Sequence, residues 1–431
     1  MNALNKLFKL DEHGSNVRTE SMAGLTTFLA MAYITVVNPS ILSDAGMDFG
    51  AVFVATCIAA AFGTIVMGLY ANYPIAQAPG MAQNAFFTFG VVLGMGHSWQ
   101  TALGAVFISG VIFVVLSVLP VREWLINAIP RNLKLGMAAG IGLFLGFIAL
   151  KNAGIVVDHP ATLVALGDLL RFEAVACIAA FVVIAALSAR KVRGAVVIGI
   201  LGAALLGWLT GNAEFNGFVA LPPSPAPVFM QLDIAAALQL SMVTVILSML
   251  IVDVFDTAGT LIGVATRAKL IGDDGRLPRL RRALLSDSTA TVVGSFAGTS
   301  STTSYIESAA GVEEGGRTGL TAVVCGLLFL GCLFFAPLAQ SVPAYATAAA
   351  LLFVACIMAR SLADIDWSDV TESAPAVVAA LAMPLSFSIA EGIGLGFICY
   401  IAIKVVSGRA GDCSLAAYVI AAIFGLKYVF L

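Results

Sequence analysis

Two aspartates lie three residues apart in a long apolar stretch of the sequence. Asp253 and Asp256 occur in the run MLIVDVFDTAGTLIGVA at 249–265, and residues three apart share one face of a helix. Two carboxylates in surroundings of low dielectric resist being ionised together, so one of them could hold a proton near neutral pH. The alternative is that one of the two only accepts a hydrogen bond from nearby backbone. The pair indicates proton binding or a polar ligand.

A third acid, Glu307, lies in the Ser/Thr-rich stretch GTSSTTSYIESAAG at 298–311. Ser304 followed three residues later by Glu307 matches a capping box, in which Glu307 would only close a helix start. The Ser/Thr run also suits extended backbone that lines a cavity inside a membrane. In that interpretation a half-helix begins here, and Glu307 faces a ligand.

The stretch APGMAQNAFFTFG at 78–90 is the matching element earlier in the chain. Pro79 and Gly80 break the chain, and Asn84 follows on the new helix with both donors and an acceptor. Phe86 and Phe255 could stack on a planar ring, although packing is the commoner role of aromatic residues in apolar segments. This element is suited to a ligand with mixed hydrogen-bonding edges.

Other polar residues near these segments have simpler expected roles. Asp287 stands at the start of an apolar run, beside a basic loop at 267–282, so an ion pair at the membrane interface is expected. Gln77 and Gln83 flank the Pro-Gly break and are expected to pack against another helix.

The composition places these residues in a membrane protein. Of the 431 residues 60% are apolar and 11% charged, whereas soluble domains carry about 45–50% apolar and about 25% charged residues. Disorder is excluded by these figures, and nucleic-acid binding by a net charge of −3. The seven cysteines stand singly without a CxxC pair or a histidine cluster, so neither a disulfide framework nor a metal site is expected.

Fifteen apolar runs approach the roughly 20 residues that a membrane crossing needs. They fall at 22–40, 50–70, 80–95, 99–120, 133–151, 170–188, 194–211, 235–264, 285–298, 303–315, 317–336, 341–359, 374–388, 390–406 and 413–430. Several are too short to cross as straight helices, namely 80–95, 285–298, 303–315 and 374–388. Short, Gly/Pro-interrupted segments at matching places in two halves indicate a transporter with broken helices.

Lysine and arginine predict the orientation, because cytoplasmic loops carry an excess of both. Only Lys151 and Arg171 fall outside, and Lys427 is unassigned. With a cytoplasmic N-terminus, the inner loops hold Lys6, Lys9, Arg18, Arg122, Arg131, Lys134, Arg190, Lys191, Arg193, the cluster Arg267, Lys269, Arg276, Arg279, Arg281 and Arg282, then Arg317, Arg360, Lys404 and Arg409.

The loop at 212–233 is long, Pro-rich and free of basic residues, so it is expected outside. Seven spans precede it and seven follow, and an odd number per half inverts the second half relative to the first. We therefore expect an all-α polytopic membrane protein. It has fourteen transmembrane segments in two inverted repeats of seven, with short extended stretches in segments 3 and 10. The final run at 413–430 is expected to be an interfacial helix.

With these residues in view, the chain resembles the nucleobase–ascorbate transporter superfamily, and within it the adenine/guanine/hypoxanthine (AzgA-like) purine permeases. The resemblance lies in GLTTFLAMAYITVVNPSIL at 24–42, APGMAQNAFF at 78–87, FDTAGTLIGVA at 255–265, and GTSSTTSYIESAAG with GGRTGLT at 298–321. It implies purine-binding carboxylates at Asp256 and Glu307, and further functional positions at Asp253 and Asn84. Ala82-Gln83 departs from the Gly-Leu or Gly-Glu of many members, which bears on substrate preference.

The resemblance also implies a division into a core domain and a gate domain, and a homodimer. The core is expected at 19–120 (segments 1–4) and 234–336 (segments 8–11), and the gate at 121–211 (segments 5–7) and 337–410 (segments 12–14). The remaining parts are a cytoplasmic N-terminus at 1–18, the external linker at 212–233 and the interfacial helix at 411–431.

The resulting hypothesis is secondary active import of a purine base (guanine, hypoxanthine or adenine) by proton symport across the bacterial inner membrane. Asp256 and Glu307 would accept N–H groups of the base, while backbone N–H groups near Gly80 or Ser304 would donate to its carbonyl. Asn84 would orient the base or Asp256, and Asp256 or Asp253 would carry the proton. No cofactor and no nucleic-acid partner are expected.

Other functions of this architecture stay open at this point. An anion transporter can share the fold but needs a cation near the half-helices, and the sequence has none from Thr19 to Val121. A permease for another base, such as uracil or xanthine, is the nearer alternative. A membrane-embedded protease is disfavoured because no HExxH or paired YD/GxGD motif occurs, and a passive channel because of the buried acids.

Overall fold

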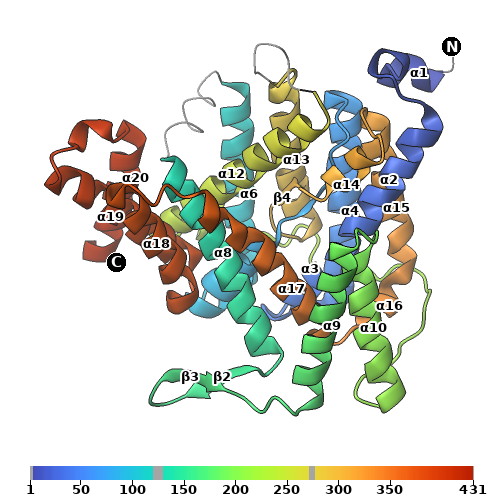
Figure 1. The fold of residues 1–431 in the computed structure, drawn as a ribbon, viewed down its shortest axis with the longest axis horizontal. Helices are drawn as coiled ribbons and strands as arrows, with labels where there is room; N and C mark the ends of the chain where they lie inside the picture. The colour runs from blue at the N-terminus through green and yellow to red at the C-terminus, as the bar shows by residue number, and fades with distance from the viewer. Residues whose placement is uncertain (1–2, 120–129, 271–276, 431) are drawn as a thin grey trace.

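A computed structural model describes residues 3–119, 130–270 and 277–430. Its helices run mainly between two ends of the molecule (Figure 1). The N-terminal helix lies at one end, and a β-hairpin between α8 and α9 lies at the opposite end.

The elements before the Pro-rich loop follow the predicted runs closely. They are α1 (Ala3–Phe8), η1 (Asp11–His13), α2 (Val17–Met31), α3 (Ile34–Ser43), α4 (Phe49–Val66), η2 (Met67–Ala71), β1 (Gln77–Pro79), α5 (Met81–Ala85), η3 (Phe86–Gly94), α6 (Trp99–Val118), α8 (Arg131–Asn152), β2 (Val156–His159), β3 (Leu163–Leu166), α9 (Phe172–Ala189) and α10 (Ala195–Thr210).

The elements after it repeat the pattern, including one short strand in the third segment. They are α11 (Ile234–Ala237), η4 (Leu240–Met242), α12 (Val243–Arg267), α13 (Leu280–Ala297), β4 (Thr302–Ser304), α14 (Ser308–Glu313), α15 (Gly319–Cys332), η5 (Leu333–Phe335), α16 (Ala336–Gln340), α17 (Ala344–Ala359), η6 (Arg360–Asp364), α18 (Val370–Ser386), α19 (Ile389–Val406), η7 (Ala410–Asp412) and α20 (Leu415–Phe430).

Within the described ranges, nine helical stretches are long and apolar enough to cross a membrane. Shorter apolar helices supply further segments, among them 81–94, 195–210 and 370–386. The short extended stretches expected in segments 3 and 10 are confirmed as β1 and β4, whereas the short runs 285–298 and 374–388 lie in the continuous helices α13 and α18.

The two extended stretches pair with each other as antiparallel strands. In the register of β1 with β4, Gln77 lies opposite Ser304 and Pro79 opposite Thr302. The Gly80 N–H donates to the Ser301 carbonyl at 2.9 Å just beyond the pair. Backbone N–H and C=O groups inside a membrane need hydrogen-bond partners within the protein. Each of the two strands supplies such partners to the other.

Two groups of helices pack most extensively. In one group α13 lies against α4 and α6, and α15 against α2 and α4. In the other, α8 lies against α17 and α18, and α18 against α19. The division into core and gate domains stays a proposal, and its first boundary, at 120/121, lies outside the described residues.

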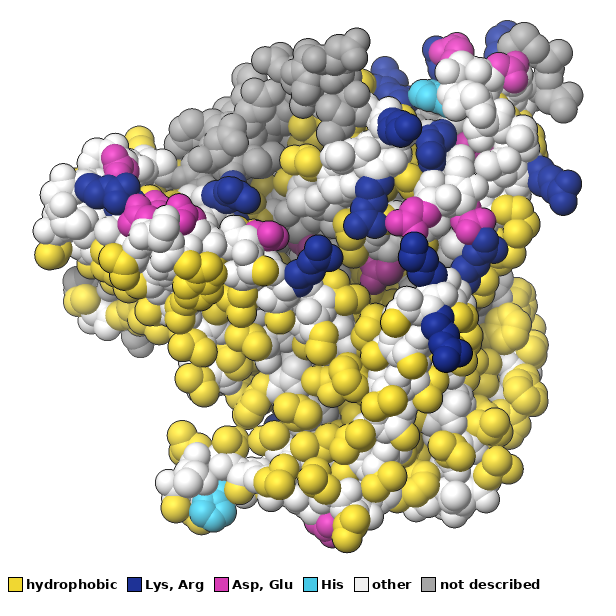
Figure 2. Space-filling view, viewed as in Figure 1, with side chains coloured by type: hydrophobic (Ala, Val, Ile, Leu, Met, Phe, Trp, Pro, Cys, Tyr) yellow, Lys and Arg dark blue, Asp and Glu magenta, His cyan; other side chains and the backbone are white. Residues whose placement is uncertain are grey.

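Charged side chains gather at one end of the molecule. Figure 2 shows Lys and Arg in a band at the end that carries the N-terminal helix, above a surface dominated by apolar side chains. Arg122 and Arg276 of the predicted inner set lie outside the described residues. The linker at 212–233 packs back on the second half, since the Ala220 N–H donates to the Phe334 carbonyl at 3.0 Å and the Met230 N–H to the Phe296 carbonyl at 2.8 Å.

Gly319 begins α15 where this helix touches the backbone of η2. A Cβ at this position would lie 1.9 Å from the Gly68 carbonyl oxygen, so Gly319→Ala must push α15 away from η2. Overpacking of this kind costs about 1–3 kcal/mol, and we expect less folded protein by size-exclusion chromatography. Gly331→Ala on the same helix is the control, because its Cβ would meet nothing within 4 Å. Equal yields of the two variants would contradict this packing.

Candidate functional site

The predicted site residues gather around the β1–β4 pair. The helix α12, which carries Asp253 and Asp256, packs against β4 and α14, and α13 packs against both strands. The broken segments of the two halves thus meet the long helix α12 in one polar region between the helices.

Asp287 on α13 accepts more side-chain hydrogen bonds than the other acids of this region. Its Oδ1 accepts hydrogen bonds from Gln77 Nε2 at 3.0 Å and Ser304 Oγ at 2.7 Å, and its Oδ2 accepts from Thr257 Oγ1 at 2.6 Å. The expected interfacial ion pair is wrong. The helix begins at Leu280, so seven residues of about 1.5 Å rise place Asp287 about 10 Å along it. Asp287 therefore joins both strands to α12.

Asp253 is equally enclosed but more weakly bonded, with 1% of its surface exposed. Its Oδ2 accepts from Thr291 Oγ1 at 3.2 Å and its Oδ1 from Gln83 Nε2 at 3.4 Å. Hydrogen bonds to an ionised carboxylate are usually about 2.5–2.9 Å long. These contacts hold a negative charge less firmly than those around Asp287.

Asp256 and Glu307 differ from these two acids because both are only half-buried. Their carboxylates are near enough to interact electrostatically. Glu307 Oε1 accepts a hydrogen bond of 2.6 Å from the Tyr33 hydroxyl, whereas Asp256 accepts none from the described residues. Neither oxygen of Asp256 is therefore engaged by a described residue.

The capping interpretation of Glu307 does not hold. Its side chain makes no capping hydrogen bond at the start of α14, and the Ser304 hydroxyl donates to Asp287 instead of accepting from α14. The Glu307 side chain bonds to Tyr33 instead.

Asn84 lies at the first chain break, and only one of its two side-chain polar atoms is hydrogen-bonded. Its Oδ1 accepts a hydrogen bond from the Ser300 hydroxyl, while its Nδ2 has no partner among the described residues although Asn84 is fully buried. An unpaired buried donor costs about 1–3 kcal/mol. A ligand acceptor at this position would remove that cost.

Gly80 and Ser304 both donate hydrogen bonds within the protein. The Gly80 N–H is bonded to the Ser301 carbonyl, and the Ser304 hydroxyl donates to Asp287. Both donors are used within the protein, and the expected role of backbone N–H groups near Gly80 or Ser304 in binding a carbonyl of the base stays a prediction.

The two candidate stacking residues, Phe86 and Phe255, differ in burial. Phe86 is 1% exposed, and its ring covers Gly90, whose Cβ would lie 2.7 Å from Phe86 Cδ2. Phe86 therefore fills the core. Phe255 is half-buried next to Asp256, with the Lys134 ammonium 5.0 Å from its ring centre, and remains placed to stack on a ligand.

Sequence reasoning missed the two tyrosines that tie this region together. Tyr33, at the break between α2 and α3, donates to Glu307, and Tyr305 donates to the Pro79 carbonyl at 2.6 Å. A tyrosine hydroxyl in an apolar segment needs a partner when buried. The sequence therefore indicates that both hydroxyls are hydrogen-bonded, but it does not indicate to which residues.

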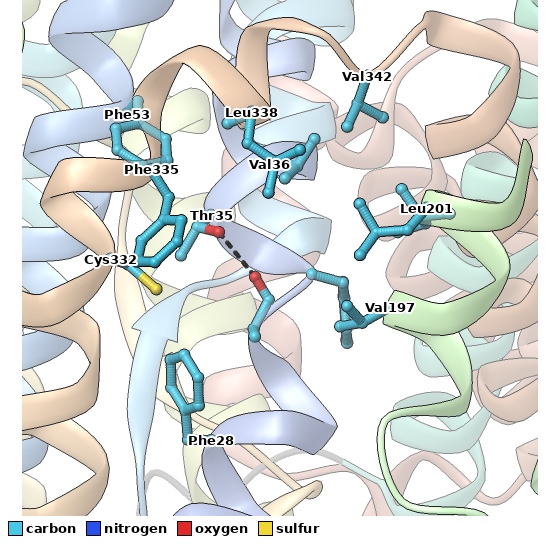
Figure 3. A pocket seen from close by; sticks show the side chains of 14 residues that line it. Phe28, Thr35, Val36, Phe53, Val197, Leu201, Cys332, Phe335, Leu338 and Val342 are labelled. Atoms are coloured by element: carbon cyan, nitrogen blue, oxygen red, sulfur yellow. Dashed lines mark hydrogen bonds between the residues drawn. The ribbon is translucent and has the colours of Figure 1, made fainter. Parts of the chain in front are cut away.

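An apolar cavity of about 230 Å³ lies on the other side of Tyr33. Figure 3 shows its walls, with Val197 and Leu201 from α10 opposite Phe53, Cys332 and Phe335. The Thr35 hydroxyl in its wall already bonds to the Ala32 carbonyl at 2.8 Å. The lining is almost entirely apolar, and the hydroxyl of its Tyr33 is already bonded to Glu307.

The sequence is similar to a family of permeases and to individual members of known function. The model of a family described as "Permease family" matches residues 18–395. Adenine permease AdeP of Escherichia coli K12 is 50% identical over 428 residues, 99% of this chain and 96% of AdeP. Guanine/hypoxanthine permease PbuG of Bacillus subtilis is 45% identical over 436 residues, 98% of this chain and 99% of PbuG.

Solved structures establish the architecture. The transmembrane domain of the cyanobacterial bicarbonate transporter BicA superposes with a TM-score of 0.65 at 13% identity, covering 87% of this chain and 97% of that domain. SLC26A9 gives the same TM-score at 11% identity, covering 94% of this chain and 68% of its own. These neighbours share a fold of two inverted repeats of seven segments, which confirms the fold expected from the sequence.

Proposed function

Because this chain belongs to the nucleobase–ascorbate transporter family, we propose that it imports a purine base together with a proton. It is a multi-pass membrane transporter and not an enzyme. The observation that carries the proposal is the pair of half-buried carboxylates, Asp256 and Glu307, with oxygens open to a ligand. Two neighbouring hydrogen-bond acceptors on different segments of the chain suit a flat molecule that carries N–H groups on more than one edge.

The chemistry of a purine fits the remaining groups. Its ring N–H and amino groups donate to the carboxylates in charge-assisted hydrogen bonds. The unpaired Asn84 Nδ2 supplies a donor for a ring nitrogen or a carbonyl, and Phe255 supplies a face for stacking. We place adenine first, since the adenine permease relative shares more residues with this chain than the guanine/hypoxanthine relative does.

Asp253 is the proposed proton carrier. It is enclosed on the same helix as Asp256, and its two long hydrogen bonds leave it free to exchange a proton as the transporter changes state. The proton and the base then cross together. The proposal includes a cytoplasmic N-terminus, a bacterial inner membrane location and a homodimer.

Uptake by cells that lack their own nucleobase permeases tests this function. We expect saturable uptake of labelled adenine that collapses with a protonophore, and weaker uptake of uracil. Asp253→Asn is expected to reduce accumulation at least about tenfold while binding changes by less than about threefold. Uptake insensitive to the protonophore would exclude proton symport. No uptake of any base by well-expressed protein would overturn the function and favour an anion transporter.

A further inference from the structure

We propose that Thr291 accepts a hydrogen bond from the proton carried by Asp253, so that protonation of this acid joins α12 to the strand β4. Thr291 lies on α13 and is fully buried. This inference rests on the proposed proton symport and adds a positioning residue for the proton to it.

The Thr291 hydroxyl lies within hydrogen-bonding distance of two groups. Its Oγ1 is 2.9 Å from the Thr302 carbonyl oxygen of β4 and 3.2 Å from Asp253 Oδ2. A hydroxyl has one proton to donate and two lone pairs that accept. A backbone carbonyl can only accept, so the shorter contact uses the Thr291 proton. The hydrogen bond between Thr291 and Asp253 then takes its proton from Asp253 Oδ2.

The other oxygen of Asp253 faces a side-chain amide. Gln83 Nε2 on α5 donates to Asp253 Oδ1 at 3.4 Å. An ionised acceptor shortens such a bond, whereas 3.4 Å exceeds the ordinary range of about 2.7–3.2 Å. The amide therefore gives a negative charge on Asp253 little support. A neutral Asp253 with its proton on Oδ2 and its carbonyl at Oδ1 fits both contacts.

A neighbouring acid is better suited to hold the negative charge. Asp253 and Asp287 are both buried and interact electrostatically, and two such carboxylates resist being ionised together. Asp287 accepts hydrogen bonds of 2.6, 2.7 and 3.0 Å from three side chains, whereas those to Asp253 are longer. When the two acids share one proton, the proton is therefore held by Asp253.

The charged groups around α12 do not compensate a charge on Asp253. The acids that act on it are Asp287 on α13 and Asp256 on its own helix. Among the elements packed against α12, α5, α6, η4 and β4 carry no ionisable side chain. The remaining charged residues lie at the exposed start of α13, as Arg281 and Arg282, or pair elsewhere, as Glu313 with Arg267, Lys404 with Glu372 and Lys427 with Glu391.

Protonation of Asp253 thus connects three elements of the site. Hydrogen bonds run from Asp253 on α12 through Thr291 on α13 to Thr302 on β4, and β4 pairs with β1. When Asp253 loses its proton, the carboxylate and the Thr302 carbonyl both attract the single Thr291 proton, so the contact to β4 weakens. Proton release therefore loosens the strand pair around which Asp256 and Glu307 gather.

The test measures how exchange of labelled adenine depends on pH, using purified protein in vesicles with equal pH on both sides. We expect exchange by the wild type to fall as the pH rises past the midpoint at which Asp253 loses its proton. Thr291→Val removes the acceptor for that proton, so its midpoint should lie at least about 0.5 pH units lower, which is about threefold weaker proton binding. Thr291→Ser keeps the hydroxyl and should keep the wild-type midpoint.

The sign of the shift decides between the two directions of the hydrogen bond. If Thr291 donated to an ionised Asp253, Thr291→Val would raise the midpoint, so a raised or an unchanged midpoint overturns the proposal. If Thr291→Val does not insert in the membrane, Thr291→Cys takes its place, because sulfur is a weak acceptor and the same sign is expected.

Thr289→Val is the matched control on α13. It also removes a threonine hydroxyl, but that hydroxyl donates to the Leu285 carbonyl of its own helix at 2.7 Å. We expect its midpoint to equal that of the wild type. A shift as large as that of Thr291→Val would mean that any lost hydroxyl on α13 moves the midpoint, and the role of Thr291 would fall.

Asp253→Asn separates this inference from the proposed function. Asparagine has no proton to lose, so exchange by this variant should not depend on pH; a wild-type pH dependence would place the proton elsewhere and overturn the role of Thr291. Exchange by the wild type that ignores pH would instead overturn proton coupling itself. The absence of any purine exchange would overturn the proposed function.

Discussion

Replacing Glu307 with glutamine is expected to lower purine uptake at least about 100-fold while the protein still inserts in the membrane. Tyr33 donates to one oxygen of Glu307, so in the variant the amide oxygen turns toward Tyr33 and the NH₂ group faces the base. A donor then meets the N–H donor of the base. A 100-fold loss equals about 2.7 kcal/mol, within the range for losing a hydrogen bond to a charged group. Initial rates of labelled adenine uptake, normalised to membrane protein, measure it.

Glu313→Gln is the matched control on the same short helix. Glu313 pairs with Arg267 at 3.3 Å, and the two side chains are 63% and 56% exposed. Exposed ion pairs contribute about 0–1 kcal/mol, so this variant should transport like the wild type. Normal uptake by Glu307→Gln would show that Glu307 has no part in binding.

Replacing Asp287 with asparagine is expected to destabilise the protein by about 3 kcal/mol and to reduce uptake at least about 30-fold. Gln77, Ser304 and Thr257 all donate to this carboxylate, and each hydrogen bond to a charged acceptor contributes about 1.5–3 kcal/mol. The NH₂ group of asparagine would face at least one of these donors. Both strands and α12 then lose their common anchor. The heating midpoint of the detergent-solubilised protein measures the loss.

Thr257→Val and Thr266→Val separate this anchor from a general effect on α12. Thr257 donates to Asp287, whereas the exposed Thr266 donates to the Ile262 carbonyl of its own helix at 2.7 Å. We expect Thr257→Val to lower the midpoint and Thr266→Val to leave it unchanged. A wild-type midpoint for Asp287→Asn would rule out the anchoring role.

The fold followed from the sequence because hydropathy and chain breaks carry direct physical signals. Apolar runs of membrane length become helices, since helices satisfy their own backbone inside a bilayer. Pro79-Gly80 and the Ser/Thr run before Glu307 interrupt that pattern, and both are extended in the structure. Asp256 and Glu307 stood out because ionisable residues are rare in such segments.

The contacts among these residues did not follow from the sequence. The prediction of an interfacial ion pair for Asp287 was wrong because closeness to a basic loop in the sequence does not show how far along α13 the residue lies. Tyr33 and Glu307 are separated by 274 positions, so no local pattern joins them. The hydrogen bonds from Gly80 to Ser301 and from Ser304 to Asp287 join separate segments of the chain, so no local pattern predicts them.

Transport by the purified protein in proteoliposomes tests purine–proton symport most directly, because no other permease is present. Labelled adenine should accumulate when the outside is made acidic, and unlabelled purines should block it. The same vesicles with Glu307→Gln should show only leak. Accumulation that ignores the pH gradient would contradict the coupling, and the absence of any purine uptake by correctly inserted protein would contradict the function itself.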